Sequence, residues 1–328
     1  MVSKIDFAGL RLLIIGKRGG ILHWPEHLIA AARRMGITYE FFATNHQNSL
    51  DRIVRRGKSI VSAEYVSEHS AKQLNILIQR FRPNFVLAVD LVKFDIRLQE
   101  ILIRYKHSYR SVHWIGDFFP KTFVSYNSFI DTFCFTDTYL LRQAEVQGLN
   151  NPVYLPLAVD TALFSRGAKP WSKRTSKILF VGAYSKNRYE ILRDFDCHLK
   201  VYGKGWSKQL LPFHEVHPHN IPLKKVVELY GSHKVILNII NSDNIACGLN
   251  MRCFEATAAG ALLLSDDVED LHECFDSDKH LKLWEMGANG KIQFDENLMA
   301  AGEVARRGHM YTHKHHTYDN RLSSILTK

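Results

Sequence analysis

The sequence predicts an α/β protein of two domains, each built on a parallel sheet. Short runs of β-branched and aromatic residues alternate with helical segments along the whole chain. Strands that are apolar throughout are typical of parallel sheets covered by helices on both faces. The alternation pauses once, at the polar residues 165–177 with Gly167 and Pro170, and then restarts. A chain of 328 residues also exceeds the usual size of one domain.

In the first half, apolar runs at residues 10–16, 37–43, 85–89, 111–115, 131–135 and 153–157 predict strands. Helical spacing of apolar residues predicts a helix ending near Met35 and helices over 72–81, 97–105 and 139–147. Pro83 follows one of these helices and Gly148 ends another, since proline lacks the N–H that a helix needs and glycine suits a helix end.

In the second half, the strands expected are 177–182, 198–203, 235–240 and 261–264, with helices over 222–231 and 248–259 and a helical tail from Asp295. We therefore divide the chain into a first domain over 1–164, a linker over 165–177 and a second domain over 178–310. A C-terminal helix over 311–328 is expected to cross back to the first domain. Two such domains would face each other across a cleft lined by the carboxyl ends of their strands.

Charge and cysteine content narrow the partners and the location. The net charge is +10, and residues 1–160 hold 20 Lys and Arg against 14 Asp and Glu. Such a surface favours anionic partners: a phosphorylated glycan, acidic lipid headgroups or nucleic acid. Five scattered Cys without a CxxC pair, and no signal peptide or run of about 20 apolar residues, predict a cytoplasmic protein. Peripheral contact with the inner membrane face is left open.

The loop and helix around residues 248–260 carry the strongest signal of a site. The helix begins with small and polar residues, so Asn250 and the free N–H groups of its first turn can face an anion. Arg252 suits a phosphate, and Glu255, three residues later, suits a sugar hydroxyl. These residues predict a nucleotide-sugar site. The alternative is an ordinary helix whose Arg and Glu pair on its surface.

Other donor-binding candidates follow the first two strands of the second domain. Gly182 ends the first strand and allows close approach of a nucleotide, and Arg188 could neutralise a diphosphate. Tyr202, Gly203 and Lys204 end the next strand, where an aromatic ring could stack on a base and the ammonium could reach a phosphate. A tight turn, an exposed helix Arg and ordinary packing are the alternatives.

The first domain offers a base and a cationic loop. Asp117 lies just past a strand and is the first candidate for a general base that removes a proton from a bound hydroxyl, with His113 as the second; capping of a turn is the alternative for Asp117. The acceptor-binding candidates are Lys17, Arg18, Gly19, Gly20 and His23. The loop is neither a P-loop nor a full dinucleotide fingerprint. The histidines at 309, 313, 315 and 316 lack the partners of a metal site, so no metal is expected.

Several segments occur in a characteristic order and spacing: 114–117, 130–137, 155–160, 179–182, 201–206 and 249–255, with Arg188, residues 316–318 and Arg321. By these segments the chain resembles, from residue 112 onward, the spore-maturation-type, family-1-like glycosyltransferases of the GT-B class. It implies the GT-B fold, a nucleotide-diphosphate sugar bound by the second domain and an acceptor on the first. It also implies no metal and no cofactor besides the nucleotide sugar as co-substrate.

One departure leaves the stereochemistry open. Many retaining GT-B enzymes carry two Glu eight positions apart, and here Cys247 stands eight positions before Glu255. The function expected is transfer of a sugar from a nucleotide-diphosphate donor to a hydroxyl, with an anionic glycan or glycolipid as acceptor. The alternatives are a glycosyltransferase acting on nucleic acid, a non-catalytic sugar- or nucleotide-binding protein, and a sugar epimerase of the same shape.

Overall fold

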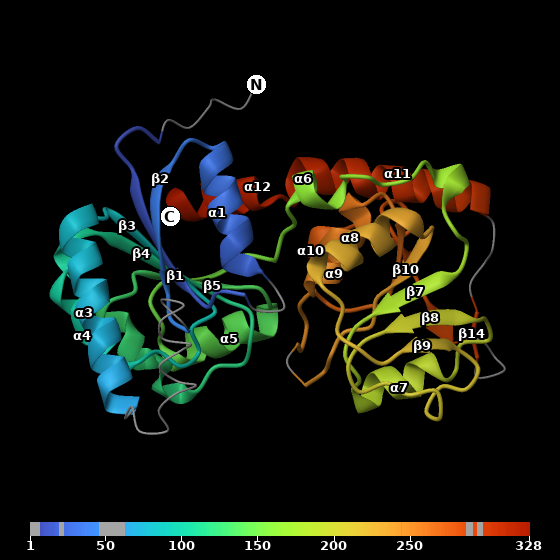
Figure 1. The fold of residues 1–328 in the computed structure, drawn as a ribbon, viewed down its shortest axis with the longest axis horizontal. Helices are drawn as coiled ribbons and strands as arrows, with labels where there is room; N and C mark the ends of the chain where they lie inside the picture. Colours follow the sequence, from blue (N-terminus) through green and yellow to red (C-terminus); the bar gives the residue numbers. More distant parts are fainter. Residues whose placement is uncertain (1–6, 20–22, 46–62, 244, 287–290, 294–297) are drawn as a thin grey trace. The chain divides into compact units, whose positions relative to one another are not determined.

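The computed structural model describes residues 7–19, 23–45, 63–243, 245–286, 291–293 and 298–328. The chain divides into two compact units, residues 1–155 with 318–328 and residues 156–317 (Figure 1). Each unit contains one six-stranded sheet, and all strand pairs within these two sheets are parallel. The expected fold class, two Rossmann-like parallel-sheet domains as in GT-B proteins, is confirmed.

The first unit has the strand order β2-β1-β3-β4-β5-β6. Its strands are β1 (Arg11–Gly16), β2 (Thr38–Ala43), β3 (Phe85–Val89), β4 (Arg110–Ile115), β5 (Thr132–Phe135) and β6 (Pro152–Tyr154). Its helices are α1 (Trp24–Arg34), α3 (Ala63–Phe81), α4 (Ile96–Arg104), α5 (Thr138–Gln147) and α12 (Tyr318–Leu326). Because β1 pairs with both β2 and β3, the chain changes direction across the sheet between β1 and β3.

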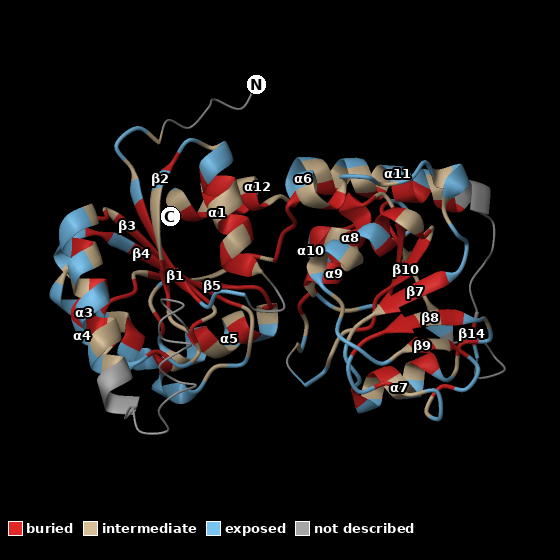
Figure 2. Ribbon diagram, viewed as in Figure 1, coloured by how far each residue is buried: buried red, intermediate tan, exposed pale blue. Residues whose placement is uncertain are grey.

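Side chains alternate between the two faces of this sheet, and helices cover both. Leu13 of β1 packs in one cluster with Leu74 of α3 and Leu98 of α4. On the other face, the ring of Trp114 of β4 lies 4.7 Å from that of Trp24 of α1 and 6.2 Å from that of Tyr318 of α12. The inner strands β3 and β5 are therefore buried at every position, as Figure 2 shows, whereas the edge strands β2 and β6 are partly exposed.

The second unit has the strand order β12-β11-β10-β7-β8-β9. Its strands are β7 (Ile178–Val181), β8 (Leu199–Tyr202), β9 (Glu215–His217), β10 (Val235–Leu237), β11 (Leu262–Ser265) and β12 (Lys282–Leu283), beside a small antiparallel pair, β13 (Glu285–Met286) and β14 (Ile292–Gln293). Its helices are α6 (Thr161–Phe164), α7 (Lys186–Leu192), α8 (Leu223–Ser232), α9 (Met251–Ala258), α10 (Leu271–Cys274) and α11 (Leu298–His315). Here the change of direction lies between β7 and β10.

The boundary between the units differs from the expected linker. The chain passes from one unit to the other at Leu155–Pro156, and residues 165–177 belong to the second unit. The N–H of Lys169 donates to the carbonyl of Gly231 at 2.8 Å, and that of Thr175 donates to Ser232 at 3.0 Å. Gly167 and Pro170 correctly predict irregular backbone in this segment. They do not show whether that backbone packs on a domain or links two domains, which is why the linker prediction differs from the structure.

The C-terminal segment consists of two helices rather than one. α11 belongs to the second unit, whereas α12 packs on α1 of the first unit. There Tyr318 stacks on His27, with ring centroids 5.1 Å apart, and Asp319 pairs with Arg34 at 2.6 Å. Within the described part of the chain, no helix combines the length and apolar composition that a bilayer span requires.

Candidate functional site

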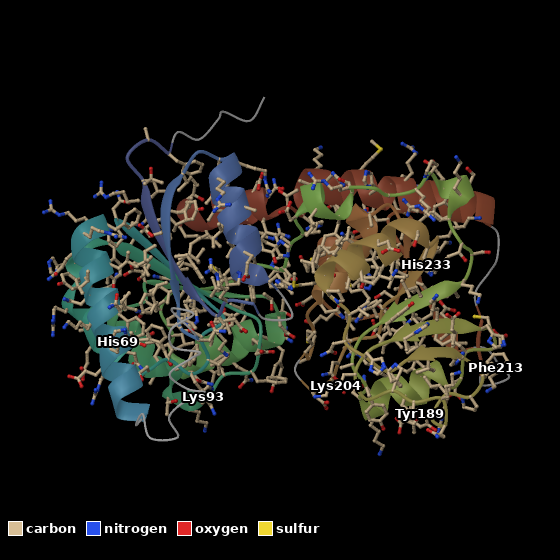
Figure 3. All side chains as sticks on the ribbon, in the orientation of Figure 1. His69, Lys93, Tyr189, Lys204, Phe213 and His233 are labelled. Carbon is tan, nitrogen blue, oxygen red and sulfur yellow. The ribbon has the colours of Figure 1, made fainter. Side chains whose placement is uncertain are left out.

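The carboxyl ends of β7 and β10 form the centre of the candidate donor site. In an open parallel sheet, the loops that follow two neighbouring strands diverge where the strand order changes direction, and this leaves a crevice. In the second unit that point lies between β7 and β10. Gly182 follows β7, and Asn238 follows β10. Lys204, after the neighbouring β8, is exposed at the same edge, and Figure 3 labels its side chain.

Arg252 of α9 holds these two strand ends together. Its Nε donates to the carbonyl of Val181 at 2.9 Å, and Nη2 donates to the same oxygen. Nη1 donates to Oδ1 of Asn238 at 2.7 Å and to the carbonyl of Ile239 at 3.5 Å. The side chain is buried, and its guanidinium lies 5.0 Å from the ring centroid of Phe180. Most of its N–H groups therefore bind protein oxygens rather than pointing to a ligand.

Arg188 lies beside Arg252 and retains more donors. Nε and Nη2 donate to the carbonyl of Ile239 at 3.2 and 3.1 Å, and Nη1 donates to Ala183 at 3.2 Å. These bonds use three of the five N–H groups of a guanidinium. Burial, and then the charge of Arg252, lower the pKa of Arg188 to about 9. Arg188 still carries its charge at neutral pH, so it remains a plausible partner for a phosphate.

Asn238 is the hub of a buried polar network that the sequence analysis did not find. Its Oδ1 accepts from Arg252 and from Nδ2 of Asn250 at 2.8 Å. Its own Nδ2 donates to Oγ of Ser265 at 3.0 Å and to Oδ1 of Asp266 at 3.1 Å. Asp266 also accepts from the N–H of Ile240 at 2.7 Å, and burial raises the pKa of Asp266. In the sequence, Asn238 is one polar residue within the apolar run 235–240, and Asp266 follows the run 261–264 and Ser265.

Glu255 lies one turn after Arg252 on α9 and differs from it in its contacts. Its side chain is partly buried, and among the described residues no hydrogen bond or ion pair engages its carboxyl. Burial raises the pKa of Glu255 to about 7, although the charge of Arg252 acts in the opposite direction. Asn250 caps the helix by accepting from the N–H of Arg252 at 3.0 Å. The surface Arg–Glu pair that was the alternative reading is not formed within this described segment.

Two glycines bring the loops after β7 and β8 into contact. A Cβ on Gly203, whose φ is 153°, would overlap the carbonyl oxygen of Gly182. A Cβ on Gly182 would lie 2.8 Å from Nη2 of Arg252. Tyr202 is buried and stacks on His217 with ring centroids 4.2 Å apart, so its ring is part of the packing. The side chain of Trp206 donates to the carbonyl of Gly182 at 2.8 Å.

In the first unit, polar residues gather at the change of direction between β1 and β3. Lys17 follows β1, Asp90 follows β3 and Asp117 follows β4 by one residue more. Burial and the neighbouring charge of Asp117 raise the pKa of Asp90, whereas the N–H of Gly116 and the charge of Lys17 lower it. Asp90 has a φ of 50°, a backbone conformation that non-glycine residues adopt mainly where the structure imposes it. Asp90 is a second acidic residue that the sequence analysis missed.

The structure places His113 in the core. Its exposed fraction is 1%, and it packs against the rings of Phe123 and Tyr126, with centroids 5.4 and 6.1 Å away. Nε2 accepts from the N–H of Leu91 at 3.1 Å, and burial lowers the pKa of His113 to about 3. This burial argues against a catalytic role for His113, because a base must reach its substrate.

The expected acceptor loop is described except for Gly20, which lies outside the described residues. The N–H of Arg18 donates to Oδ1 of Asn45 at 2.7 Å, and that of Gly19 donates to Glu26 at 2.9 Å. His23 adopts a left-handed conformation before α1. The side chains of Lys17 and Arg18 are exposed. In the part of the chain that the structure describes, no group of three His, Cys, Asp or Glu is arranged to hold a metal ion.

The comparison with protein families concerns most of the second unit and helix α12. Residues 177–327 match the family described as glycosyl transferase-like. The matched segment contains every donor-site residue described above, from Gly182 to Glu255. The sequence-based expectation of a glycosyltransferase-like second domain is therefore supported at this level. Among curated proteins, none matches the sequence of this chain.

Solved structures share the fold over nearly the whole chain. A glycosyltransferase from Rickettsia africae ESF-5 has a TM-score of 0.65 at 11% identity, covering 97% of each chain. Sucrose-phosphate synthase from Thermosynechococcus elongatus has a TM-score of 0.63 at 11% identity, covering 97% of this chain and 98% of its own. HepE from Anabaena, in complex with UDP-glucose, has a TM-score of 0.60 at 10% identity with the same coverage. Identities this low show a shared fold.

Proposed function

We propose that this protein is a glycosyltransferase that moves a sugar from a nucleotide-diphosphate donor to a hydroxyl acceptor. The observation that carries the proposal is the carboxyl of Glu255, which makes no hydrogen bond or ion pair with the described residues, in a domain that matches glycosyl transferase-like proteins. A carboxylate can accept hydrogen bonds from both hydroxyls of a ribose. Leaving such a group partly buried without a partner is costly unless a ligand provides one.

The diphosphate would be neutralised by side chains rather than by a metal. Arg188 keeps N–H groups that oxygens of the described residues do not use, and Lys204 is exposed beside the same strand ends. Negative charge grows on the departing nucleotide in the transition state, so cations placed there in advance accelerate transfer. In this proposal Arg252 acts indirectly: it fixes the ends of β7 and β10 and lowers the cost of ionising Glu255.

On the first domain, Asp117 is the proposed base for the acceptor hydroxyl. Asp117 and Asp90 interact electrostatically, and burial raises the pKa of Asp90. Asp117 follows the carboxyl end of β4, where a general base can reach a bound hydroxyl. Such a base serves an inverting transfer. Lys17 and Arg18 would hold an anionic acceptor such as a phosphorylated glycan. We further propose that the protein is one of the spore-maturation-type glycosyltransferases.

Donor binding tests the proposal directly. UDP-, GDP-, ADP- and dTDP-sugars would be titrated by calorimetry, with UDP-glucose first because a protein of the same fold is described in complex with it. Glu255→Gln should weaken donor binding about tenfold or more, since it removes a charge-assisted contact. The matched control is Glu273→Gln, at an exposed Glu on α10. Failure of every nucleotide sugar to bind, or equal affinities of the two variants, contradicts the proposal.

Transfer itself separates an enzyme from a binding protein. Donor consumption and product linkage would be followed by NMR with a phosphorylated glycan, the same glycan without phosphate, and random DNA as acceptors. Asp117→Asn should abolish transfer and leave donor affinity unchanged. Tight donor binding without turnover on any acceptor would instead indicate the binding-protein alternative, and isomerised donor would indicate an epimerase.

A further inference from the structure

A cavity of about 560 Å³ lies in the second unit, away from the donor site. It is bounded by the segment before β7, by the turn between α9 and β11, and by α11. The lining residues that bear on binding are Lys169, Trp171, Arg174, Gly302, Arg306 and His309. Four of these residues are basic, and none of them is acidic. The cavity wall therefore combines the cations Lys169, Arg174 and Arg306 with apolar residues such as Trp171.

The cavity lies near the amino ends of the strands of the second sheet, whereas the donor-site residues lie at their carboxyl ends. It meets α9 at Ala259, after the last turn, whereas Asn250 and Arg252 begin that helix. An eight-residue helix is about 12 Å long, so the two ends are well separated. Figure 3 labels a residue near each end of the strands: His233, which precedes β10, and Lys204, which follows β8. Thr175, next to Arg174, forms a bridge with His233.

Arg174 is the central observation. Nε donates to the carbonyl of Lys169 at 2.8 Å, and Nη2 donates to that of Ala259 at 2.8 Å. Nη1 is buried and has no hydrogen-bond partner among the described residues. A buried, charged donor without an acceptor is costly, and Arg174 lines the cavity, so an oxyanion bound there would supply the acceptor once the guanidinium turns toward it. Arg174 thus carries both a structural contact with the end of α9 and an unused donor group.

The surrounding side chains suit an anion that has an organic part. Lys169 is exposed and lines the cavity, while Arg306 is paired with Glu303 at 2.8 Å. Nδ1 of His309 is bonded to the carbonyl of Ala258 at 2.8 Å. Trp171 presents a half-buried indole, against which a Cβ on Gly302 would come within 3.0 Å. An aromatic wall beside several cations fits a phosphate attached to a ring.

We propose that this cavity binds a small phosphomonoester, with its phosphate on Arg174, Lys169 and Arg306 and its organic part against Trp171. The site is distinct from the donor site and does not depend on the proposed glycosyl transfer. Inorganic phosphate has the negative charge of a phosphomonoester but no organic part. Its binding therefore depends on the basic residues alone, whereas binding of a phosphomonoester also depends on Trp171.

The test is a calorimetric titration of the full chain with glucose 6-phosphate, inorganic phosphate and glucose at constant ionic strength. We expect glucose 6-phosphate to bind most tightly and glucose not to bind. Arg306→Gln and Lys169→Gln should each weaken glucose 6-phosphate about tenfold, the effect of one charge-assisted contact. Trp171→Phe should weaken glucose 6-phosphate but not inorganic phosphate.

The controls separate this site from the donor site. Lys173→Gln removes the same charge from the same segment at an exposed residue that does not line the cavity. Glu255→Gln alters only the donor site. Both should bind glucose 6-phosphate as the unmodified protein does. Arg174→Gln is not the primary variant because Arg174 also contacts the end of α9. No binding to the unmodified protein, or unchanged binding in both Arg306→Gln and Lys169→Gln, overturns the proposal.

Discussion

Nη1 of Arg252 donates to Oδ1 of Asn238 at 2.7 Å and so joins helix α9 to the carboxyl end of β10. The same guanidinium donates to the carbonyl of Val181 at the end of β7. These two strands pair with each other, and the chain changes direction across the sheet between them. One side chain therefore holds together the carboxyl ends of the two strands at which parallel α/β domains bind their ligands.

Arg252→Lys should destabilise the second domain by about 2–4 kcal/mol. The guanidinium of Arg252 binds two strand ends at once, which a lysine ammonium cannot do, so the substitution leaves buried oxygens without donors. The measurement is urea-induced unfolding followed by tryptophan fluorescence. Arg193→Lys, at an exposed position at the end of α7, is the control and should change the unfolding free energy by less than about 0.5 kcal/mol. Equal stabilities of the two variants would show that the Arg252 contacts contribute little.

Glu255→Gln should stabilise the protein while it weakens donor binding. The pKa of Glu255 is raised from 4.5 to about 7, so the folded state holds a proton that the unfolded state has released. Stability then falls as pH rises from about 4.5 to 7 and stays level above that. The full shift corresponds to about 3 kcal/mol, and partial exposure reduces it to about 1–3 kcal/mol.

The measurement for Glu255→Gln is the urea midpoint of variant and unmodified protein between pH 4 and 8. We expect similar midpoints near pH 4 and a higher midpoint for the variant at pH 8. Glu273→Gln, which changes an exposed Glu, should follow the unmodified protein at every pH. A gap between Glu255→Gln and the unmodified protein that does not grow with pH would mean that this carboxyl is not held protonated.

Gly203→Ala should destabilise the second domain by more than about 3 kcal/mol. A Cβ at this position would overlap the carbonyl oxygen of Gly182, and the φ of 153° is unfavourable for alanine. Gly167→Ala is the matched control, because Gly167 also has a positive φ, 73°, but nothing within 4 Å of an added Cβ. The control should lose about 1–2 kcal/mol from backbone conformation alone. Urea unfolding of both variants separates the two causes: the steric overlap with Gly182 should make the loss in unfolding free energy larger for Gly203→Ala than for Gly167→Ala.

The fold could be predicted from the sequence because the buried strands are apolar runs. β3 has the bounds expected for it, since Phe85–Val89 is buried at every position. β9 was missed: it is a three-residue edge strand, and both Glu215 and His217 are polar and partly exposed. An edge strand of this kind is defined by its hydrogen bonds to β8, which leave no periodic pattern in the sequence.

The site was predicted in part, and the reason is the same. Arg252 and Glu255 could be assigned to a ligand from their place on a helix, but the main partners of Arg252 are the backbone of Val181 and the side chain of Asn238. Backbone carbonyls carry no residue-type signal, so the contacts that make Arg252 structural were invisible in the sequence. Asn238 itself was hidden as one polar residue within an otherwise apolar run. His113 is the converse case, a polar residue whose burial composition does not reveal.

His113 should remain neutral well below the pH at which most histidines gain a proton. Its pKa is lowered from 6.5 to about 3 because the ring is buried, and Nε2 accepts from the N–H of Leu91. The unfolded state then binds a proton that the folded state does not bind, so stability falls as pH decreases from about 6.5 to 3, by on the order of 4 kcal/mol in all.

His113→Gln keeps a hydrogen-bond acceptor near the N–H of Leu91 and removes the titrating group. Its urea midpoint should therefore decline less steeply between pH 6.5 and 4 than that of the unmodified protein or of the exposed control His219→Gln. Parallel declines for all three proteins would show that His113 titrates normally, which would return it to the candidates for the catalytic base.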